Sequence, residues 1–260
     1  MILLNNVRKI PVFILSNDEQ VMSSDYLASE SLVKLNFAPG KSVNLLASPD
    51  CLEELFIGHL IAEGYLSPNR YLNSKQVQAE RDKNGTISVS YTEPLELSRE
   101  ISAEKPVSTS CGACNNDSLE LLISSLPLVD IRDINVSLDV LNQGFESMKL
   151  SQNGFKTTGG MHCSGLVKMS GEFLIAREDI GRHNAVDKLI GASINDYNLN
   201  DCILLLSGRC GWDIVAKAAR ANIPCIASLG AASTLAAETA RKLGIKLYTF
   251  VKPNRSVIIG

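Results

Sequence analysis

The stretch Cys202-Ile-Leu-Leu-Leu-Ser-Gly-Arg209 begins the most regular part of the chain. Its first five residues form a short apolar run, which is typical of a strand that is buried on both faces. Similar runs at 224–228 and 245–250 follow, and helical patterns at 213–221 and 234–243 separate them. Strands that alternate with helices of this length predict βαβ units and a mainly parallel sheet, so the fold class is α/β.

Upstream of this region the pattern changes to hairpins and single helices. Alternating residues at 31–47 predict two strands, and residues 77–91 predict a hairpin that turns at Asn84-Gly85. Ser48-Pro49-Asp50 has the composition of a helix start, with Ser48 as the N-cap. This helix is expected to end at Gly64, where the apolar pattern stops.

Further elements are expected between the first hairpins and Cys202. We expect helices at 117–125 and 138–152, a hairpin across 158–178 and a helix after Asn184. The segment 93–110 has no clear periodicity and is expected to form a loop.

Composition limits the class of protein. The chain has 260 residues, of which 45% are hydrophobic and 20% are charged, so it can bury a sizeable core. A net charge of −3 gives no support to broad binding of nucleic acid or anionic membranes. The N-terminus lacks the order of a secretory signal, and no stretch reaches the ~20 apolar residues of a membrane helix. We therefore expect a cytoplasmic protein without a nucleic-acid or membrane partner.

The chain has seven cysteines, and their odd number and irregular spacing argue against a disulfide framework. Cys51, Cys202 and Cys225 lie in apolar segments and are expected to be buried as small hydrophobic residues. The remaining feature is a single CxxC pair, Cys111-Gly-Ala-Cys114.

Two cysteines at this spacing can bind half of a metal site, cycle between dithiol and disulfide, or carry sulfur. A structural zinc site usually needs two such pairs, and the sequence has no second one, so no metal site is expected. A thioredoxin-like dithiol normally begins a helix after a strand, whereas Cys111 follows a long irregular segment. Sulfur carriage needs a nucleophilic thiolate that partners can reach. The spacing alone leaves all three chemistries open.

Polar side chains gather in two further segments. Gly159-Gly160-Met161-His162 and the region of Arg182 and His183 combine flexible backbone with donors. They can cap a helix and form an ion-paired turn, or they can line a pocket for an anionic or purine ligand.

Two turns after apolar strands have the composition of phosphate-binding sites. In Ser207-Gly208-Arg209, glycine lets the backbone approach a phosphate and arginine supplies a forked donor. The segment 250–255 adds two basic residues and an asparagine, although Pro253-Asn254 is also typical of an ordinary surface turn. Because ligands bind at the carboxyl ends of strands in such sheets, the two turns favour a nucleotide or dinucleotide ligand.

These motifs resemble the FdhD family, the formate dehydrogenase accessory sulfurtransferases. The resemblance extends from about residue 31 to the C-terminus, and the motifs occur in the family's order. They are Cys111-Gly-Ala-Cys114, Gly159-Gly160-Met161-His162, Glu178-Asp-Ile-Gly-Arg-His-Asn-Ala-Val-Asp-Lys188, Ser207-Gly208-Arg209 and the turn at 250–255.

The resemblance implies both an architecture and a reaction. It implies a cytidine-deaminase-like, three-layer α/β domain with a cofactor pocket at 111–260, a smaller N-terminal α+β portion at 1–110, and a homodimer. Cys111 would carry a persulfide and Cys114 would be its partner. Sulfur would come from an L-cysteine desulfurase and pass to a bis-molybdopterin guanine dinucleotide cofactor, with Mo or W, before insertion into the formate dehydrogenase catalytic subunit.

The resemblance and the turns together give a set of expected cofactor-binding residues, for which GDP would be a mimic ligand. The set is Phe250, Val251, Lys252, Pro253, Asn254, Arg255, His162, Arg182, His183, Ser207, Gly208 and Arg209. Four departures from the family pattern fall near this pocket: Asn115, Cys163, Gly211 and the segment 228–234.

Two other functions remain as alternatives. A zinc-dependent deaminase needs His-x-Glu upstream of Pro-Cys-x-x-Cys. Here Ser110 replaces the proline, and the upstream histidine, in His59-Leu-Ile, is not followed by the required glutamate. A guanine-nucleotide or cofactor-binding chaperone without sulfur transfer would need the pocket but not the cysteines.

Overall fold

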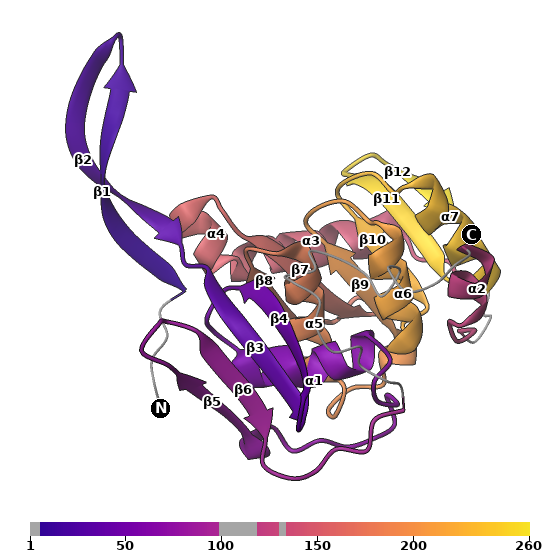
Figure 1. The fold of residues 1–260 in the computed structure, drawn as a ribbon. Helices are drawn as coiled ribbons and strands as arrows, with labels where there is room; N and C mark the ends of the chain where they lie inside the picture. The colour runs from indigo at the N-terminus through magenta and orange to yellow at the C-terminus, as the bar shows by residue number, and fades with distance from the viewer. Residues whose placement is uncertain (1–5, 99–118, 130–133) are drawn as a thin grey trace.

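The computed structural model describes residues 6–98, 119–129 and 134–260 (Figure 1). The chain begins with a long antiparallel hairpin, β1 (Val7–Ser16) and β2 (Glu19–Ala28), which the sequence analysis did not predict. Its turn places Asn17 and Asp18 at positive φ, as a two-residue hairpin loop requires. The hairpin projects from the body of the molecule (Figure 1).

The next strands form a four-stranded sheet in the order β4-β3-β6-β5. Both predicted hairpins are confirmed, and they turn at Gly40 and Gly85, which adopt positive φ. The strands are β3 (Ser31–Ala38), β4 (Lys41–Ala47), β5 (Val77–Arg81) and β6 (Ile87–Tyr91).

Helix α1 (Leu52–Ala62) follows β4 and is buried between this sheet and the rest of the chain. The prediction of Ser48 as its N-cap is wrong, because Cys51 occupies that position without a side-chain hydrogen bond. The Ser48 hydroxyl instead accepts from the Ile180 N–H at 3.1 Å, far along the chain. The tertiary contact therefore replaces the local cap.

The C-terminal half contains a six-stranded sheet in the order β12-β11-β10-β9-β7-β8. Strand β10 is parallel to β9 and β11, but the pairings β7–β8, β7–β9 and β11–β12 are antiparallel. The prediction of a mainly parallel sheet is therefore wrong, because two short hairpins extend the parallel centre. The strands are β7 (His162–Lys168), β8 (Phe173–Asp179), β9 (Cys202–Leu206), β10 (Cys225–Ser228), β11 (Lys246–Lys252) and β12 (Arg255–Ile259).

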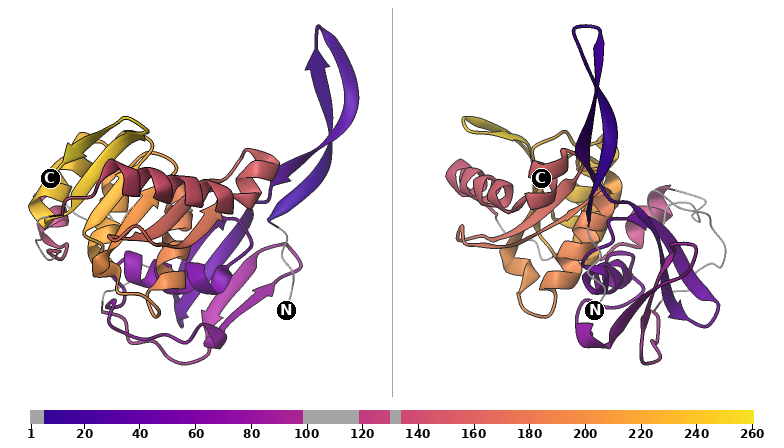
Figure 2. Two further views of the ribbon diagram at one scale, coloured as in Figure 1. Left: turned by 180° about the vertical axis from the view of Figure 1, so that it is seen from behind. Right: turned by 90° about the vertical axis from the view of Figure 1, so that its left-hand side faces the viewer.

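Helices cover both faces of this sheet, so the described C-terminal part has three layers. Helix α3 packs on one face through Leu141, Phe145 and Met148, and α5 and α6 pack on the other (Figure 2). The predicted helices are confirmed to within a few residues. They are α2 (Leu119–Ser124), α3 (Leu138–Ser151), α5 (Arg182–Ser193), α6 (Trp212–Arg220) and α7 (Thr234–Leu243). The described residues also contain the short α4 (Asn153–Thr158) and 3-10 turns at Ser74–Gln76 and Leu199–Asp201.

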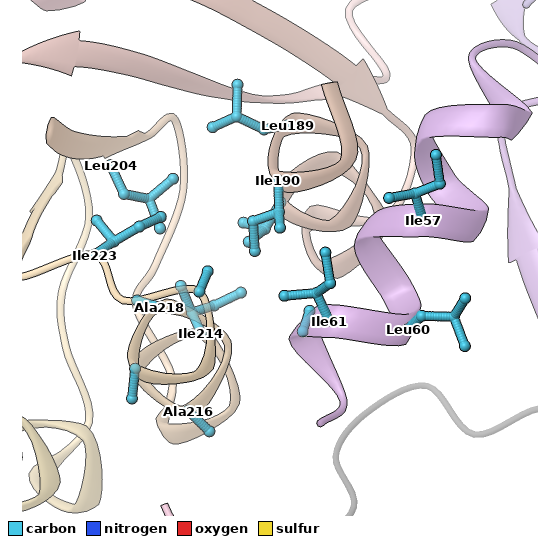
Figure 3. Close-up of a cluster of buried hydrophobic side chains, with 14 of the residues drawn as sticks. Ile57, Leu60, Ile61, Leu189, Ile190, Leu204, Ile214, Ala216, Ala218 and Ile223 are labelled. Atoms are coloured by element: carbon cyan, nitrogen blue, oxygen red, sulfur yellow. The ribbon is translucent and has the colours of Figure 1, made fainter. Parts of the chain in front are cut away.

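One hydrophobic core joins the two sheets. Ile57 and Ile61 of α1 meet Ile190 of α5 and Ile214 of α6 in one cluster of buried side chains (Figure 3). The expected boundary at 110/111 lies outside the described residues. None of the described helices is long and apolar enough to cross a membrane.

Candidate functional site

The two cysteines expected to carry sulfur, Cys111 and Cys114, lie outside the described residues, as does most of the expected loop at 93–110. The other expected site residues all fall within the described part of the chain. They occupy the ends of strands in the six-stranded sheet and the start of α5.

Sheet topology brings His162 beside the turn that follows β9. Strand β7 runs antiparallel to β9, with Ser164 opposite Leu206, so the beginning of β7 lies next to the end of β9. Two hydrogen bonds fix the junction: the Ser207 N–H donates to the Cys163 carbonyl at 3.0 Å, and the Cys163 N–H donates to the Ser207 hydroxyl at 2.9 Å. This edge also contains the carboxyl end of β10.

Gly208 and Gly230 allow the two strand-end turns to approach each other closely. A Cβ on Gly208 would lie 3.2 Å from His162 Nδ1, and one on Gly230 would lie 2.9 Å from the Gly208 carbonyl oxygen. The Gly230 N–H donates to that carbonyl at 3.2 Å. The Ser228 hydroxyl donates to the same oxygen at 2.5 Å. Glycine is thus needed for packing, and it also leaves backbone accessible beside His162.

Positive charge gathers around His162. Burial lowers the pKa of His162, and the charges of Arg182 and Arg209 lower it further, while Asp179 opposes them. The imidazole is therefore neutral at pH 7. The guanidinium of Arg182 is about one-third exposed, and Arg209 is exposed. Two arginine charges next to a half-buried histidine make this edge of the sheet positively charged. Such an edge favours the binding of an anion.

His183 points towards α6 and contacts a carboxylate there. Its Nε2 contacts Asp213 Oδ2, and Arg182 Nη2 lies 4.0 Å from the same oxygen. Burial lowers the pKa of His183 although Asp213 opposes this shift. The sequence analysis missed Asp213, and the only local signal is its place in the first turn of a helix.

Glu178 and Asp179 hold other elements in place and do not face the edge as free ligands. The Glu178 carboxylate accepts from the N–H groups of Gly154 and Phe155, both at 2.8 Å, and so caps the start of α4. Asp179 is fully buried, accepts from the Ser48 N–H at 3.0 Å and pairs with Lys188 at 2.7 Å. These contacts support the capping and ion-pair interpretation for this part of the motif.

Lys188 and Lys217 are buried cations that connect α5 and α6 to α1. Burial alone would lower the pKa of Lys188, but Asp179 and Asp50 outweigh it and raise this pKa. Lys217 Nζ lies 2.6 Å from Asp187 Oδ1 and 2.7 Å from Glu63 Oε1. His59 Nδ1 lies 2.9 Å from the other oxygen of Asp187. His59 therefore has a structural role as a partner of the buried Asp187.

The segment 250–255 is divided between two strands, so only Pro253 and Asn254 form the turn. Phe250 adopts positive φ, its N–H donates to the Gly230 carbonyl at 3.1 Å, and its ring is 43% exposed. Val251 is buried in the core beneath α3 and does not present its side chain to the surface. Lys252, Asn254 and Arg255 are exposed, and the Pro253 carbonyl accepts from Asn142 Nδ2 at 3.1 Å.

The five cysteines in the described residues are free thiols, and all are at least partly buried. Burial raises the pKa of Cys51, Cys163 and Cys210 to about 12, and that of Cys202 to about 11. It also raises the pKa of Cys225. The predicted burial of Cys202 and Cys225 is confirmed, whereas Cys51 is only partly buried. Within the same residues, no group of three or more His, Cys, Asp and Glu side chains could hold a metal ion.

Comparison with known proteins covers nearly the whole chain. The model of the FdhD/NarQ family matches residues 28–259. A sulfur carrier protein FdhD from Sulfurisphaera tokodaii is 31% identical over 255 residues, covering 95% of this chain and 94% of that protein. Another from Thermoplasma volcanium is 33% identical over 238 residues, covering 88% and 85%.

The fold has a counterpart among solved structures. A crystal structure from Desulfotalea psychrophila, assigned as a formate dehydrogenase accessory protein, aligns with a TM-score of 0.69. The alignment covers 98% of this chain and 96% of that one at 22% identity, which shows a shared mixed α/β fold. Together with the family match across 28–259, the relatives at 31% and 33% identity show that this chain belongs to the FdhD/NarQ family.

Proposed function

We propose that this chain is a sulfur carrier protein of formate dehydrogenase maturation, with Cys111 as the persulfide carrier and Cys114 as its partner thiol. Relatives named sulfur carrier protein FdhD match it over nearly the whole chain. The observation that carries the assignment is the state of the other thiols. Seven cysteines occur in the sequence, and the five in the described residues all have a raised pKa.

A raised thiol pKa removes the species that accepts sulfur. The thiolate is the nucleophile, and a pKa shift from 9.0 to about 12, as at Cys163, reduces the thiolate fraction at neutral pH. The reduction is roughly a thousandfold for three pKa units. Burial also prevents a bulky donor protein from approaching the sulfurs of Cys163, Cys202, Cys210 and Cys225. Cys111 and Cys114 therefore remain as candidates for attack on a donor persulfide.

The proposed transfer balances as two thiol exchanges. The Cys111 thiolate attacks the outer sulfur of the desulfurase persulfide, the donor S–S bond breaks, and the donor cysteine leaves as a thiolate. The Cys114 thiolate then attacks the inner sulfur of the Cys111 persulfide and releases hydrosulfide to the molybdenum or tungsten of the cofactor substrate. The resulting Cys111–Cys114 disulfide is reduced by an external dithiol.

The cationic sheet edge is the proposed site for that substrate, bis-molybdopterin guanine dinucleotide. Arg182 and Arg209 beside His162 fit its pyrophosphate groups, and the accessible backbone at Gly208 permits close approach. The exposed ring of Phe250 offers a stacking surface for guanine. GDP combines a diphosphate with the same base and is the proposed mimic. Val251, Lys252, Pro253, Asn254 and Arg255 extend this proposal along the β11–β12 turn, while Ser207 and His183 belong to it at the end of β9 and the start of α5.

The proposed function also implies two protein partners and a place in the cell. An L-cysteine desulfurase supplies sulfur in the cytoplasm, and the catalytic subunit of formate dehydrogenase receives the cofactor. The D. psychrophila structure assigned as a formate dehydrogenase accessory protein supports this client. A cytidine-deaminase-like classification of the three-layer portion rests on the family resemblance, and we propose it together with the cofactor pocket.

Intact-mass analysis tests the sulfur-carrier proposal. The protein is incubated with a desulfurase and L-cysteine, and its mass is measured before and after treatment with a dithiol. We expect a gain of one sulfur atom that the reductant removes and that Cys111→Ala abolishes. Cys51→Ala is the matched control and should load normally, because the pKa of Cys51 is raised to about 12. Unchanged loading in Cys111→Ala would refute the assignment.

A second measurement separates a sulfur carrier from a cofactor-binding chaperone. The sheet edge is built without Cys111 or Cys114, so GDP binding should survive replacement of both by alanine. A sulfur carrier then loses formate dehydrogenase activation in cells despite normal GDP binding. Retention of both properties would favour the chaperone.

A further inference from the structure

The carboxylate of Asp213 lies where the start of α5 meets the start of α6. Its Oδ2 atom contacts His183 Nε2 and lies 4.0 Å from Arg182 Nη2, so the first two residues of α5 both act on one oxygen of α6. The Asp213 side chain is only 11% exposed. It is therefore held between the two helices and does not move freely in solvent.

The surroundings of this carboxylate are those of an anion site. Arg182 supplies a full positive charge, and the ring of His183 supplies a nitrogen in direct contact. Asp213 also lies in the first turn of α6, where the positive end of the helix dipole favours an anion. The N-cap of α6 is Gly211, which has no side chain to satisfy that end of the helix. Asp213 thus fills an anion position with a carboxylate of the protein itself.

Arg182 belongs both to this contact and to the proposed phosphate site. Besides burial, the charge of Arg182 lowers the pKa of His162, so the guanidinium also acts on the cationic sheet edge. A phosphate bound to Arg182 would lie close to the Asp213 carboxylate, and two negative charges on one guanidinium repel each other. A ligand must therefore displace the carboxylate or bind against its charge.

Gly211 makes room for the carboxylate in this position. A Cβ on Gly211 would lie 2.2 Å from Asp213 Oδ1. The backbone of Gly211 is extended, with φ −88° and ψ 172°, which any residue can adopt. The space that glycine leaves, and not its conformational freedom, is therefore what matters here. A side chain at this position would push the carboxylate away from the turn.

We propose that Asp213 is an internal competitor for the anion position of the cationic sheet edge and so determines which ligands the edge retains. This role rests on the proposed function, which assigns the edge to the pyrophosphate of the cofactor. A small free anion such as pyrophosphate gains only phosphate contacts, which the carboxylate opposes. A guanine dinucleotide also gains a base contact at Phe250, which offsets the same cost. When the cofactor leaves, the carboxylate takes its place again and favours release.

Calorimetric titration of the full chain with GDP and with inorganic pyrophosphate tests the role of Asp213. Asp213→Asn keeps the shape of the side chain and removes its charge, so both ligands should bind roughly tenfold more tightly than to the wild type. Glu80→Gln is the matched control, because it removes the same charge from an exposed position on β5 in the other sheet. Its affinities should stay within about twofold of the wild type.

Gly211→Ala tests the position of the carboxylate without a change of charge. Its methyl group displaces the Asp213 carboxylate, so pyrophosphate should again bind more tightly. Urea titration checks that each variant is folded. Unchanged pyrophosphate binding in this folded variant would contradict competition from the present position of the carboxylate.

Unchanged or weaker pyrophosphate binding by Asp213→Asn would overturn the role of Asp213 while leaving the cofactor site intact. A carboxylate that only positions Arg182 would give such a loss. A wild type that binds no GDP would instead refute the sheet edge as the cofactor site, and the competitor role with it. Sulfur loading at Cys111 is measured separately by mass, so failure of the carrier chemistry is distinguishable from both results.

Discussion

Gly58 on α1 and Gly191 on α5 meet backbone to backbone where the two helices cross. A Cβ on Gly58 would lie 1.7 Å from the carbonyl oxygen of Asp187, and one on Gly191 would lie 1.9 Å from that of Glu54. Helix α5 begins with Arg182 at the cationic edge, so this crossing fixes the edge relative to the N-terminal sheet.

Gly58→Ala should destabilise the protein, because its methyl group would overlap backbone that has no flexible end to move. The helices must separate, and we expect a loss of about 3 kcal/mol in the free energy of unfolding. Gly160→Ala is the control, since its Cβ meets its nearest neighbour at 3.5 Å. Urea titration measures both variants, and equal midpoints would contradict the tight crossing.

Lys217→Met should destabilise the fold more than removal of a surface cation. It leaves the Asp187 and Glu63 carboxylates buried without their shared partner, and breaking a buried pair in this way costs about 3 to 5 kcal/mol. Lys168→Met is the matched control, because its pair with Glu172 is exposed to solvent, which screens the interaction. Similar losses in the two variants, measured by chemical denaturation, would show that the network contributes little.

Glu63 gives the fold a defined acid sensitivity. Burial alone would raise the pKa of Glu63, but the charge of Lys217 prevails and lowers it from 4.5 to about 2. A carboxyl with a depressed pKa stabilises the folded state above its ordinary pKa, and this stability is lost as the pH falls from 4.5 towards 2. Glu63→Gln should remove a pH dependence on the order of 3 kcal/mol across that window. Identical acid-unfolding curves for variant and wild type would contradict the shift.

The thiols should divide into two reactivity classes. Near neutral pH, iodoacetamide should modify Cys111 and Cys114 quickly and the buried Cys163, Cys210 and Cys225 slowly, because burial raises the pKa of the last three. Peptide mapping of the folded protein, compared with a denatured sample, separates the classes. Rapid modification of Cys163 in the folded chain would oppose the assignment of the carrier by elimination.

Elements whose signals are local were predictable from the sequence. The strand Cys202–Leu206 and the helix Thr234–Leu243 have the predicted bounds, because an apolar run, a serine cap and Gly244 define them locally. The β1–β2 hairpin was missed because both of its faces are exposed, so the alternation of apolar and polar residues that marks a half-buried strand is absent.

Pairings between distant residues were not predictable from local patterns. Nothing near Ser48 indicates that its hydroxyl accepts from Ile180 instead of capping α1. The Asp213 contact to His183 and the Lys217 contact to Asp187 likewise exist only after α5 and α6 have packed together. The sequence therefore indicated which polar residues belong to this edge, while the topology determined which of them lie side by side.

GDP affinity should depend on Arg209 and on pH. Arg209→Ala removes a charge-assisted contact, and we expect roughly tenfold weaker binding. Because the pKa of His162 is lowered, its imidazole gains a proton only at acidic pH, where a third positive charge should strengthen binding. Calorimetry from pH 8 downwards should show this gain in wild type and a smaller one in His162→Gln. Lys242→Ala on α7 is the neutral control, and loss of affinity there would indicate nonspecific charge attraction.

Glu178→Gln separates the structural part of the long motif from its ligand-binding part. The Glu178 carboxylate accepts hydrogen bonds from the N–H groups of Gly154 and Phe155, both at 2.8 Å. The amide of glutamine has one acceptor oxygen and can satisfy only one of these groups. The substitution should therefore loosen the start of α4 and lower the free energy of unfolding by about 1 kcal/mol. Amide hydrogen exchange should increase in Asn153–Thr158 while GDP affinity stays within twofold of wild type, a tolerance of about 0.4 kcal/mol. Arg182→Ala should give the opposite pattern, with weaker GDP binding and unchanged exchange in α4. If both variants lost GDP binding equally, Glu178 would belong to the pocket and the capping interpretation would be wrong.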